Sequence, residues 1–239
     1  MTTSGTSLGS PKGMTRRRAE TRRRVIEAAY DVFTELGIRD APVELICDRA
    51  GFTRGAFYSN FASKEELFLA VYEVQMQERT ERLRAAVAEA AATADPAAPD
   101  VVTRVLQDAS VLFTESLTAD ETWYLLNVEF RAQALRRPDL RAPTAAAERR
   151  FHDALAEILL DLLGRLGLRL TVEPHNAVVT MVRLYETMLE RAILDELPST
   201  ADNRYLTEVL PRLLTALVTQ AGDSTFSSPD NGNDHRSSH

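Results

Sequence analysis

Cysteine, aromatic residues and long apolar runs are scarce in this chain, and each scarcity removes a class of structure. Cys47 is the only cysteine among 239 residues, so an internal disulfide cannot form. Aromatic residues make up 7%, and no alternating apolar run predicts a β-strand. No apolar run reaches the ~18 residues of a membrane span, and no apolar stretch follows the arginines at 16–18 to form a secretory signal. We therefore expect an all-α, cytoplasmic protein without a membrane partner.

Patterns typical of catalysis and of metal binding are also missing. The histidines are His152, His175, His235 and His239, and none stands in a His/Cys spacing typical of zinc sites. The chain contains neither a glycine-rich phosphate loop nor a nucleophile motif. We predict no catalytic residue, no metal site and no cofactor, and Cys47 is expected to be a small buried apolar residue.

Charge is distributed unevenly along the chain. The net charge is −7, but residues 1–64 carry 11 Lys and Arg against 7 Asp and Glu, which gives +4. Residues 65–239 carry the other 17 and 28, which gives −11. A basic front and an acidic rear predict a nucleic-acid-facing module on a body that faces elsewhere.

Residues 42–61, PVELICDRAGFTRGAFYSNF, predict a helix, a tight turn and a second helix. Pro42 suits the first position of one helix, Gly51 ends it, and Thr53 can cap the next. The apolar side of the second helix would be held by Phe52, Phe57 and Phe61. Its other faces carry small and polar residues that suit a close approach to a DNA groove: Arg54, Gly55, Ala56, Tyr58, Ser59 and Asn60.

The neighbouring segments predict a three-helix unit and a long connecting helix. Residues 21–36 have one apolar face and end at Gly37. Ser63 and Glu66 form a capping box that starts a helix of close to thirty residues. Six arginines at 16–24 are expected to contact phosphates in part; the alternative is a solvated charge run that leads into the helix.

Residues 50–71, AGFTRGAFYSNFASKEELFLAV, resemble the TetR family of bacterial transcriptional regulators, and residues 22–37 and 43–51 match its pattern in order and spacing. The resemblance implies a homodimer that presents the helix at 53–61 to the major groove of a palindromic operator. It implies that Tyr58 and Lys64 contact the DNA backbone. The family usually has a hydroxyl residue where Pro42 and Val43 stand, and Arg54 would either read guanine or hold a phosphate. The predicted DNA-binding residues are Arg22, Pro42, Val43, Thr53, Arg54, Gly55, Ala56, Tyr58, Ser59, Asn60 and Lys64.

Four segments follow from these patterns. Residues 1–14 are expected to be disordered, 15–64 to form the DNA-binding domain with its helix-turn-helix at 42–61, 65–221 to form a helical effector-binding and dimerisation domain, and 222–239 to be a disordered tail. Within the second domain we expect helices at 100–117, 120–137, 144–166, 174–197 and 202–219. Pro211 predicts a kink or split in the last of these.

A small apolar or amphipathic effector is the expected ligand of the second domain. The candidate pocket residues are Phe113, Trp123, Leu126, Asn127, Phe130, Arg131, Tyr185 and Met188. The alternative is that the aromatic residues are core and that Glu129 and Arg131 form an internal or interface ion pair. Two apolar faces predict half of a dimeric four-helix bundle: Val178, Val182, Tyr185 and Leu189, then Leu206, Leu210, Leu213 and Leu217.

These expectations combine into a DNA-binding repressor that releases its operator when a small molecule binds the C-terminal domain. The alternative is an effector-independent regulator or activator controlled by abundance or by a protein partner. An all-helical enzyme is the third possibility and has the least support in the sequence.

Overall fold

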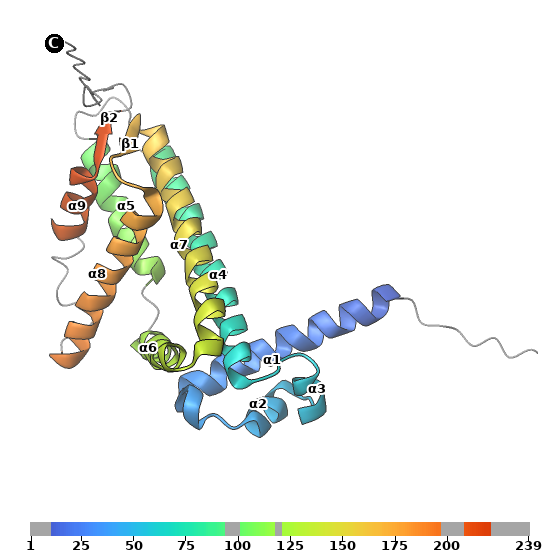
Figure 1. Ribbon diagram of the computed structural model, residues 1–239. Coiled ribbons are helices and arrows are strands. Elements are labelled where there is room, and N and C mark those ends of the chain that lie inside the picture. The colour runs from blue at the N-terminus through green and yellow to red at the C-terminus, as the bar shows by residue number, and fades with distance from the viewer. Residues whose placement is uncertain (1–10, 94–100, 118–120, 197–207, 221–239) are drawn as a thin grey trace, which may run out of the picture.

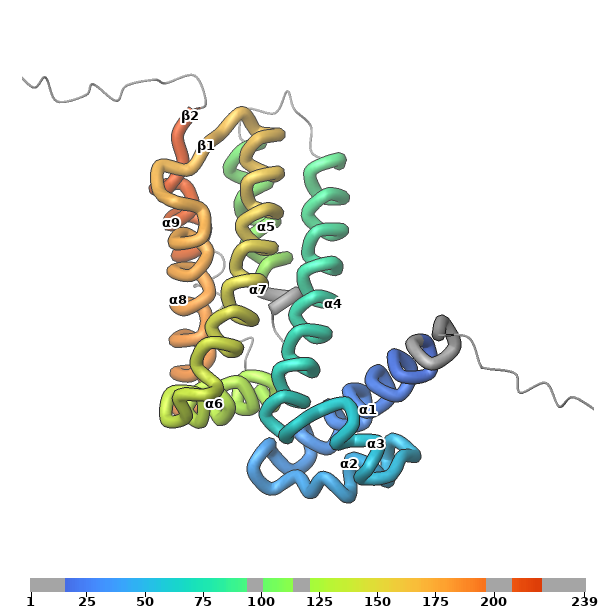
Figure 2. Tube along the Cα trace, turned by 45° about the vertical axis from the view of Figure 1, so that its right-hand side comes forward, coloured from blue at the N-terminus to red at the C-terminus, as the bar shows by residue number. Residues whose placement is uncertain are grey.

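The computed structural model describes residues 11–93, 101–117, 121–196 and 208–220, which form a small N-terminal unit and a taller helical body (Figure 1). The unit contains α1 (Pro11–Asp40), α2 (Val43–Ala50) and α3 (Arg54–Tyr58). The connecting helix α4 (Lys64–Thr93) leaves this unit and rises through the body (Figure 2). The body is completed by α5 (Val101–Leu117), α6 (Glu121–Arg136), α7 (Pro138–Arg165), β1 (Leu168–Leu170), α8 (Pro174–Leu194), α9 (Leu210–Ala216) and β2 (Val218–Gln220).

The N-terminal unit is held by the apolar face of α1, which packs against α2 and α4. Val25, Val32 and Phe33 have no exposed surface, and Phe57 of α3 is equally buried. Cys47 is buried in the same core, as its residue type predicted. The core therefore fixes α3 from one side only, through Phe57, and leaves its other faces to the solvent.

Local chemistry places the ends of these helices. Gly51 adopts a left-handed conformation (φ 72°), and the Thr53 side chain accepts a hydrogen bond from Ala56 N. The Ser63 hydroxyl accepts from Glu66 N, and the Glu66 carboxylate accepts from Ala62 N. The predicted caps are thereby confirmed.

Three expectations about these helices were wrong in detail. Pro42 is the N-cap of α2, with an extended backbone (φ −74°, ψ 138°), so the first helical residue is Val43. The third helix ends at Tyr58 rather than at Phe61. The first helix begins at Pro11 instead of 21, so residues 11–14 are helical rather than disordered. Arg23 pairs with Glu20 and Glu27, one turn away on either side, and these pairs stabilise the arginine-rich part of the helix. Residues 1–10 and 222–239 lie outside the described part.

In the body, α4, α7 and α8 run side by side, and α6 crosses their lower ends next to the N-terminal unit (Figures 1 and 2). Aromatic rings fill this junction: the ring centroids of Phe68 and Phe130 are 4.5 Å apart, and those of Phe68 and Trp123 are 6.0 Å apart. Among the described residues, no helix is both long and apolar enough to span a bilayer.

The later helices follow the predicted order, with two differences. α7 starts at Pro138, not at 144, because Pro138 suits the first turn of a helix and Pro143 lies close behind it. The helix expected at 202–219 ends at Ala216, and β2 follows it and pairs antiparallel with β1, Leu168 opposite Gln220. Strands of three residues are too short to show an alternating pattern. Pro211 lies in the first turn of α9, and residues 202–207 are outside the described part.

The predicted dimer face is occupied within the subunit. Val178, Val182, Tyr185 and Leu189 of α8 are all at most 9% exposed and face the interior beside α4 and α7. Leu210 of α9 is buried as well, and Leu206 lies outside the described residues. The assignment of the α8 residues and Leu210 to a second subunit was therefore wrong, because the subunit needs them for its own core. Leu213 and Leu217 are only half-buried, so their place in a dimer interface stays a prediction.

Candidate functional site

The outer surface of α3 is largely exposed. Phe57 is fully buried, whereas the neighbouring Tyr58 is 51% exposed and meets the Phe57 ring edge to face at 5.1 Å. Other predicted DNA-binding residues on this surface are also exposed: Thr53, Arg54, Gly55 and Ser59. Ala56 is half-buried among them. At the start of α2, Pro42 is exposed and Val43 is half-buried against the core.

Gly55 lies in the middle of this surface, and its own chain does not require glycine there. A Cβ atom at Gly55 would meet only the Thr53 hydroxyl, at an ordinary 3.7 Å. Glycine in a helix costs about 1 kcal/mol relative to alanine. No contact within the chain therefore explains glycine at this position. Without a side chain at Gly55, the backbone of α3 is exposed and another molecule can approach it closely.

Two predicted contact residues are held in place by neighbours. Arg54 pairs with Glu44 of α2, and its guanidinium lies 5.9 Å from the Tyr58 ring centroid. Asn60 was expected to donate to phosphate, but its amide donates to Ala56 O at 2.8 Å and so ties the end of α3. The Arg54 side chain is therefore held between Glu44 and Tyr58. The Asn60 side chain stabilises the C-terminal end of α3 by its bond to Ala56 O.

The arginines of α1 divide into a supporting and a surface group. Arg22 is half-buried, with its guanidinium 4.5 Å from the Phe61 ring centroid, so it packs on the core rather than projecting outward. Arg18 belongs to the arginine run at 16–24 but was not singled out, and its Nη2 donates to Ser59 O at 3.0 Å, which brings a positive charge to the end of α3. No signal in the sequence links two positions 41 residues apart.

Lys64 has a structural role that the sequence did not indicate. Its Nζ donates to the carbonyl oxygens of Ile38, Arg39 and Ala41 at 2.8, 2.8 and 2.9 Å. These bonds use all three donors of an ammonium group. In the chain without DNA, Lys64 is therefore bonded to the corner between α1 and α2, and its phosphate contact stays a prediction.

Glu129 of α6 holds the same corner from the other side. Its Oε2 accepts from Ile38 N at 3.0 Å, and its Oε1 accepts from Arg39 N at 2.8 Å. Gly37 turns the chain just before this point with φ 78°, and a Cβ there would lie 3.3 Å from Glu129 Oε2. We call residues 37–41, with Glu129 and Lys64, the corner clamp. It joins α4 and α6 to the N-terminal unit.

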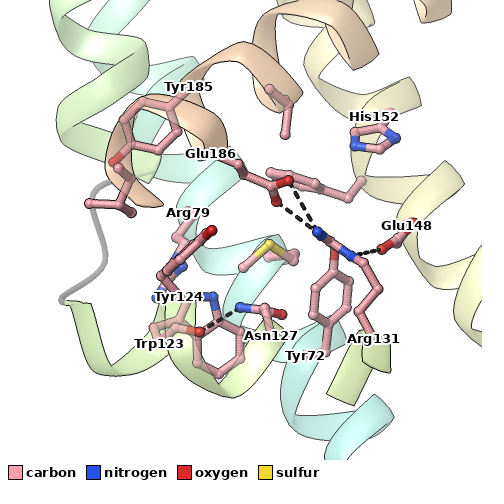
Figure 3. A pocket seen from close by; sticks show the side chains of 14 residues that line it. Tyr72, Arg79, Trp123, Tyr124, Asn127, Arg131, Glu148, His152, Tyr185 and Glu186 are labelled. Carbon is pink, nitrogen blue, oxygen red and sulfur yellow. Dashed lines mark hydrogen bonds and ion pairs between the residues drawn. The ribbon is translucent and has the colours of Figure 1, made fainter. Parts of the chain in front are cut away.

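A cleft with a cavity volume of about 60 Å³, the lower cleft, lies above α6 between α4, α7 and α8 (Figure 3). Four of the eight predicted pocket residues line it, namely Trp123, Asn127, Arg131 and Tyr185. Leu126 and Phe130 are core residues, Met188 packs against the core, and Phe113 lines a different cavity. The prediction missed Tyr72, Met76, Arg79, Tyr124, Glu148, Phe151, His152, Val182, Glu186 and Leu189.

Arg131 is the centre of a half-buried ionic network in this cleft. It bonds Glu148 at 3.2 Å and Glu186 at 3.0 Å, and Arg183 pairs with the same two carboxylates from the edge of the cleft. The alternative of an Arg131–Glu129 pair is not formed within the subunit, because Glu129 binds Ile38 N and Arg39 N instead. The signal for the missed partners was present in the sequence, since Glu186 is a carboxylate beside Tyr185 on an otherwise apolar face.

Burial and neighbouring charges set the ionisation of the cleft. Burial alone would raise the pKa of the Glu186 carboxyl, but bonds and charges from Arg131 and Arg183 outweigh it and keep that pKa below its usual value. Burial lowers the pKa of His152, so its imidazole is neutral at pH 7, and burial raises the pKa of the Tyr72 phenol. The cleft thus combines aromatic walls with a compensated set of charges, an arrangement suited to binding a small molecule.

Comparisons with known proteins agree on the type of protein. Residues 25–71 match the family of bacterial regulatory proteins described as the tetR family. The chain is 48% identical over 52 residues to the HTH-type transcriptional regulator SrpR of Pseudomonas putida, a segment that covers 22% of this chain and only 24% of SrpR. It is 30% identical over 161 residues to the regulator CymR of the same species, covering 66% of this chain and 74% of CymR. The crystal structure of the multidrug binding protein EbrR complexed with imidazole has a TM-score of 0.53 and 26% identity, over 80% of this chain and 93% of EbrR.

The clamp predicts a change in stability for Lys64→Met. The variant leaves three carbonyl groups of the corner without their charged donor and should lower the free energy of unfolding by about 1–3 kcal/mol. Arg82→Met removes an exposed cation from the same helix and should change the free energy of unfolding by less than about 0.5 kcal/mol. Urea denaturation checks both values, and equal stabilities would show that the Lys64 bonds do not hold the corner.

Proposed function

Because the chain belongs to the tetR family of bacterial regulatory proteins, we propose that it is a DNA-binding repressor that releases its operator when a small molecule occupies the lower cleft. Its partners are then double-stranded DNA with a palindromic operator, a second copy of the chain and an organic effector. It acts in the cytoplasm and catalyses no reaction. The observation that carries the proposal is that α6 contributes both to the cleft and to the corner clamp.

The DNA contact is assigned to the exposed surface of α3. Gly55 has no side chain, so the helix backbone can approach the floor of the major groove there. Ala56 offers an apolar contact to a thymine methyl group. Tyr58 and Arg54 flank Gly55 and reach toward bases or phosphates. Arg18 adds positive charge at the end of α3, which strengthens binding to any sequence.

The release mechanism works through α6. Asn127 and Arg131 line the cleft, and Glu129 between them binds the corner between α1 and α2. A ligand that displaces Arg131 from its carboxylate partners moves α6 and with it the corner. Two α3 helices must lie about 34 Å apart to enter successive major grooves, so a tilt of a few ångströms prevents the fit. A ligand that prefers the released geometry 100-fold supplies about 2.7 kcal/mol for this change.

The EbrR structure supports a small organic ligand. That protein is described as a multidrug binding protein and was crystallised with imidazole. The lower cleft of the present chain has aromatic walls from Trp123, Tyr124 and Tyr185, which suit flat or apolar molecules. An effector-controlled regulator is therefore favoured over one controlled by abundance alone.

Gly55→Ala tests the DNA-binding surface. Alanine should raise the free energy of unfolding by about 0.5–1 kcal/mol, yet weaken operator binding by about tenfold or more, because its methyl group keeps the helix from the groove floor. Gly164→Ala is the matched control, since nothing lies within 4 Å of a Cβ there and α7 is far from α3. It should give the stability gain without the loss of binding. Operator fragments selected from random DNA and fluorescence anisotropy provide the measurement; an unchanged affinity for Gly55→Ala would remove α3 from the interface.

Glu129→Gln tests the release mechanism. The amide replaces one acceptor oxygen with a donor, so the two backbone N–H groups of the corner can no longer both be satisfied. A library of small organic molecules, screened by quenching of Trp123, supplies the effector; Trp123 is the only tryptophan in the chain and lines the cleft. The variant should bind this effector as the parent does but require about tenfold more of it to release DNA.

Glu121→Gln, at the start of the same helix, is the control for Glu129→Gln and should release DNA normally. If both variants release the operator at the parent's effector concentration, α6 does not transmit the signal through the corner. If no compound in the library releases the operator from the parent protein, the effector proposal itself fails.

The homodimer is proposed from the family and from the symmetry of a palindromic operator, not from the apolar face of α8. Sedimentation at micromolar concentration should give about twice the chain mass of 26.6 kDa. Val182→Asp would disturb the subunit core rather than an interface, since Val182 is 5% exposed. A monomer at this concentration, with or without operator DNA, would contradict the dimer.

A further inference from the structure

A groove between α4 and α7 lies next to the lower cleft. This outer groove has a cavity volume of about 420 Å³, and its lining residues come from these two helices. Two ion pairs connect the same helices: Glu73 pairs with Arg150, and Arg84 lies 3.8 Å from Glu157. Because these four side chains are exposed, the outer groove is open to the solvent and polar at its rim.

Three side chains line both the lower cleft and the outer groove, namely Tyr72 and Met76 from α4 and Phe151 from α7. We call these three residues the seam. On α4, Arg79 lines the cleft and Thr80 lines the groove. Both follow Met76 by one turn, so Met76 lies between the two linings.

The same division occurs on α7 at Phe151. Glu148 and His152 line the lower cleft, whereas Ala147 and Ala154 line the outer groove. These residues lie within one turn of Phe151 on its two sides. The cleft and the groove are therefore neighbouring spaces that are separated at the side chains of the seam.

The lower cleft alone is too small for an aromatic ligand. Its volume is about 60 Å³. A protein cavity that takes one benzene molecule measures about 150 Å³. The outer groove, with about 420 Å³, falls within the range of ligand pockets, which is roughly 300–1,000 Å³. A ring that enters the cleft must therefore displace side chains, and the groove can hold the rest of such a molecule.

Met76 is the seam residue best suited to move. Its side chain is unbranched, has three rotatable bonds and is 7% exposed. The Tyr72 ring, by contrast, is stacked on Trp123, with ring centroids 6.4 Å apart (Figure 3). When Met76 turns toward the groove, the cleft opens beside Tyr72, and neither α4 nor α7 has to shift.

We propose that the effector is an aromatic molecule that binds across the seam, with one ring beside Tyr72 and Trp123 and the rest of the molecule in the outer groove. Met76 turns aside to admit the ring. Aromatic ligands suit this place because Tyr72 and Trp123 already form a stacked pair that a further ring can extend. The inference rests on the proposed effector role of the lower cleft and specifies the class of the ligand and the second half of its site.

A ring tethered in the outer groove tests the seam without a known effector. Gln77→Cys supplies a thiol there, since Gln77 is exposed, lines the groove and follows Met76. Cys47 is buried, and burial raises the pKa of its thiol, so it does not compete for the reagent. Bromophenylpropyl methanethiosulfonate attaches a bromophenyl ring to the new cysteine through a flexible chain. Bromine quenches tryptophan fluorescence on contact, and Trp123 lines the cleft but not the groove.

The tethered ring should cross the seam and lower the Trp123 emission by about half or more, because a short tether gives an effective concentration on the order of millimolar. Methyl methanethiosulfonate, which adds no ring, should leave the emission unchanged. Glu78→Cys is the matched control, since Glu78 is exposed on the same helix and lines neither space. Its bromophenylpropyl adduct should also leave the emission unchanged.

Ala154→Cys places the thiol in the groove from α7 and should give the same quenching, which keeps the test valid where the Gln77 variant fails to fold. Equal quenching from Gln77→Cys and Glu78→Cys would overturn the proposal. So would the absence of quenching from both groove positions.

Met76→Ile tests which side chain opens the seam. Isoleucine has a similar volume but is branched at Cβ and therefore stiff. In the Gln77→Cys background it should reduce the quenching by about threefold or more, because the seam no longer opens beside Tyr72. Unchanged quenching in this variant would contradict the opening at Met76.

Operator binding by the same adducts distinguishes this inference from the repressor proposal. The bromophenylpropyl adduct of Gln77→Cys should bind the selected operator about tenfold more weakly than the methyl adduct. If the tethered ring quenches Trp123 but neither it nor any library compound releases the operator, the site across the seam stands and the repressor proposal fails. If the ring does not quench Trp123 while a library compound releases the operator, the inference is wrong and the repressor proposal stands.

Discussion

The backbone of the corner between α1 and α2 cannot satisfy its own hydrogen bonds, and two side chains of opposite charge do this for it. Glu129 accepts from Ile38 N and Arg39 N, and Lys64 donates to three carbonyl groups of the same segment. Unpaired backbone groups in a half-buried place cost free energy comparable to a lost hydrogen bond. The orientation of the N-terminal unit therefore depends on where α4 and α6 hold these two side chains.

The same two helices contribute to the lower cleft, which places the proposed ligand site a short distance from the proposed DNA-binding unit. On α6, Arg131 and Glu129 are two residues apart, and on α4 Tyr72 lies two turns beyond Lys64. The path consists of rigid helices and direct bonds, so small shifts at the cleft are not absorbed by soft segments. Arg131 is suited to start such a shift, because its partners Glu148 and Glu186 come from α7 and α8.

Local sequence chemistry was sufficient for the helical architecture and for those helix ends that a glycine or a capping side chain marks. Gly37, Gly51, Thr53 and Ser63 act within a few residues of themselves, so their roles follow from residue type and spacing. The exposed face of α3 could be predicted for the same reason, since Phe57 fixes which side is buried. The bonds of Lys64 within the chain, by contrast, could not be predicted, because its carbonyl partners lie more than twenty residues earlier and no local pattern reveals them.

The lining of the lower cleft also could not be predicted fully from local sequence patterns. Half of the predicted pocket residues line it, and those that failed, such as Phe130, are aromatic side chains that the core uses instead. The apolar face of α8 was assigned to a dimer because amphipathicity shows that a face is buried but not against what. The full set of residues that lines the lower cleft becomes evident only when α4, α6, α7 and α8 are placed together.

Amide hydrogen exchange at Ile38 and Arg39, with and without a ligand that releases DNA, tests the central claim most directly. In the free protein both amides donate to Glu129 and should exchange slowly. Bound ligand should accelerate both, while the amide of Phe57 in α3 keeps its rate, because α6 moves away from the corner and α3 stays folded. Release of DNA with unchanged exchange at both amides would contradict the account, since the signal would then reach α3 without passing through the corner clamp.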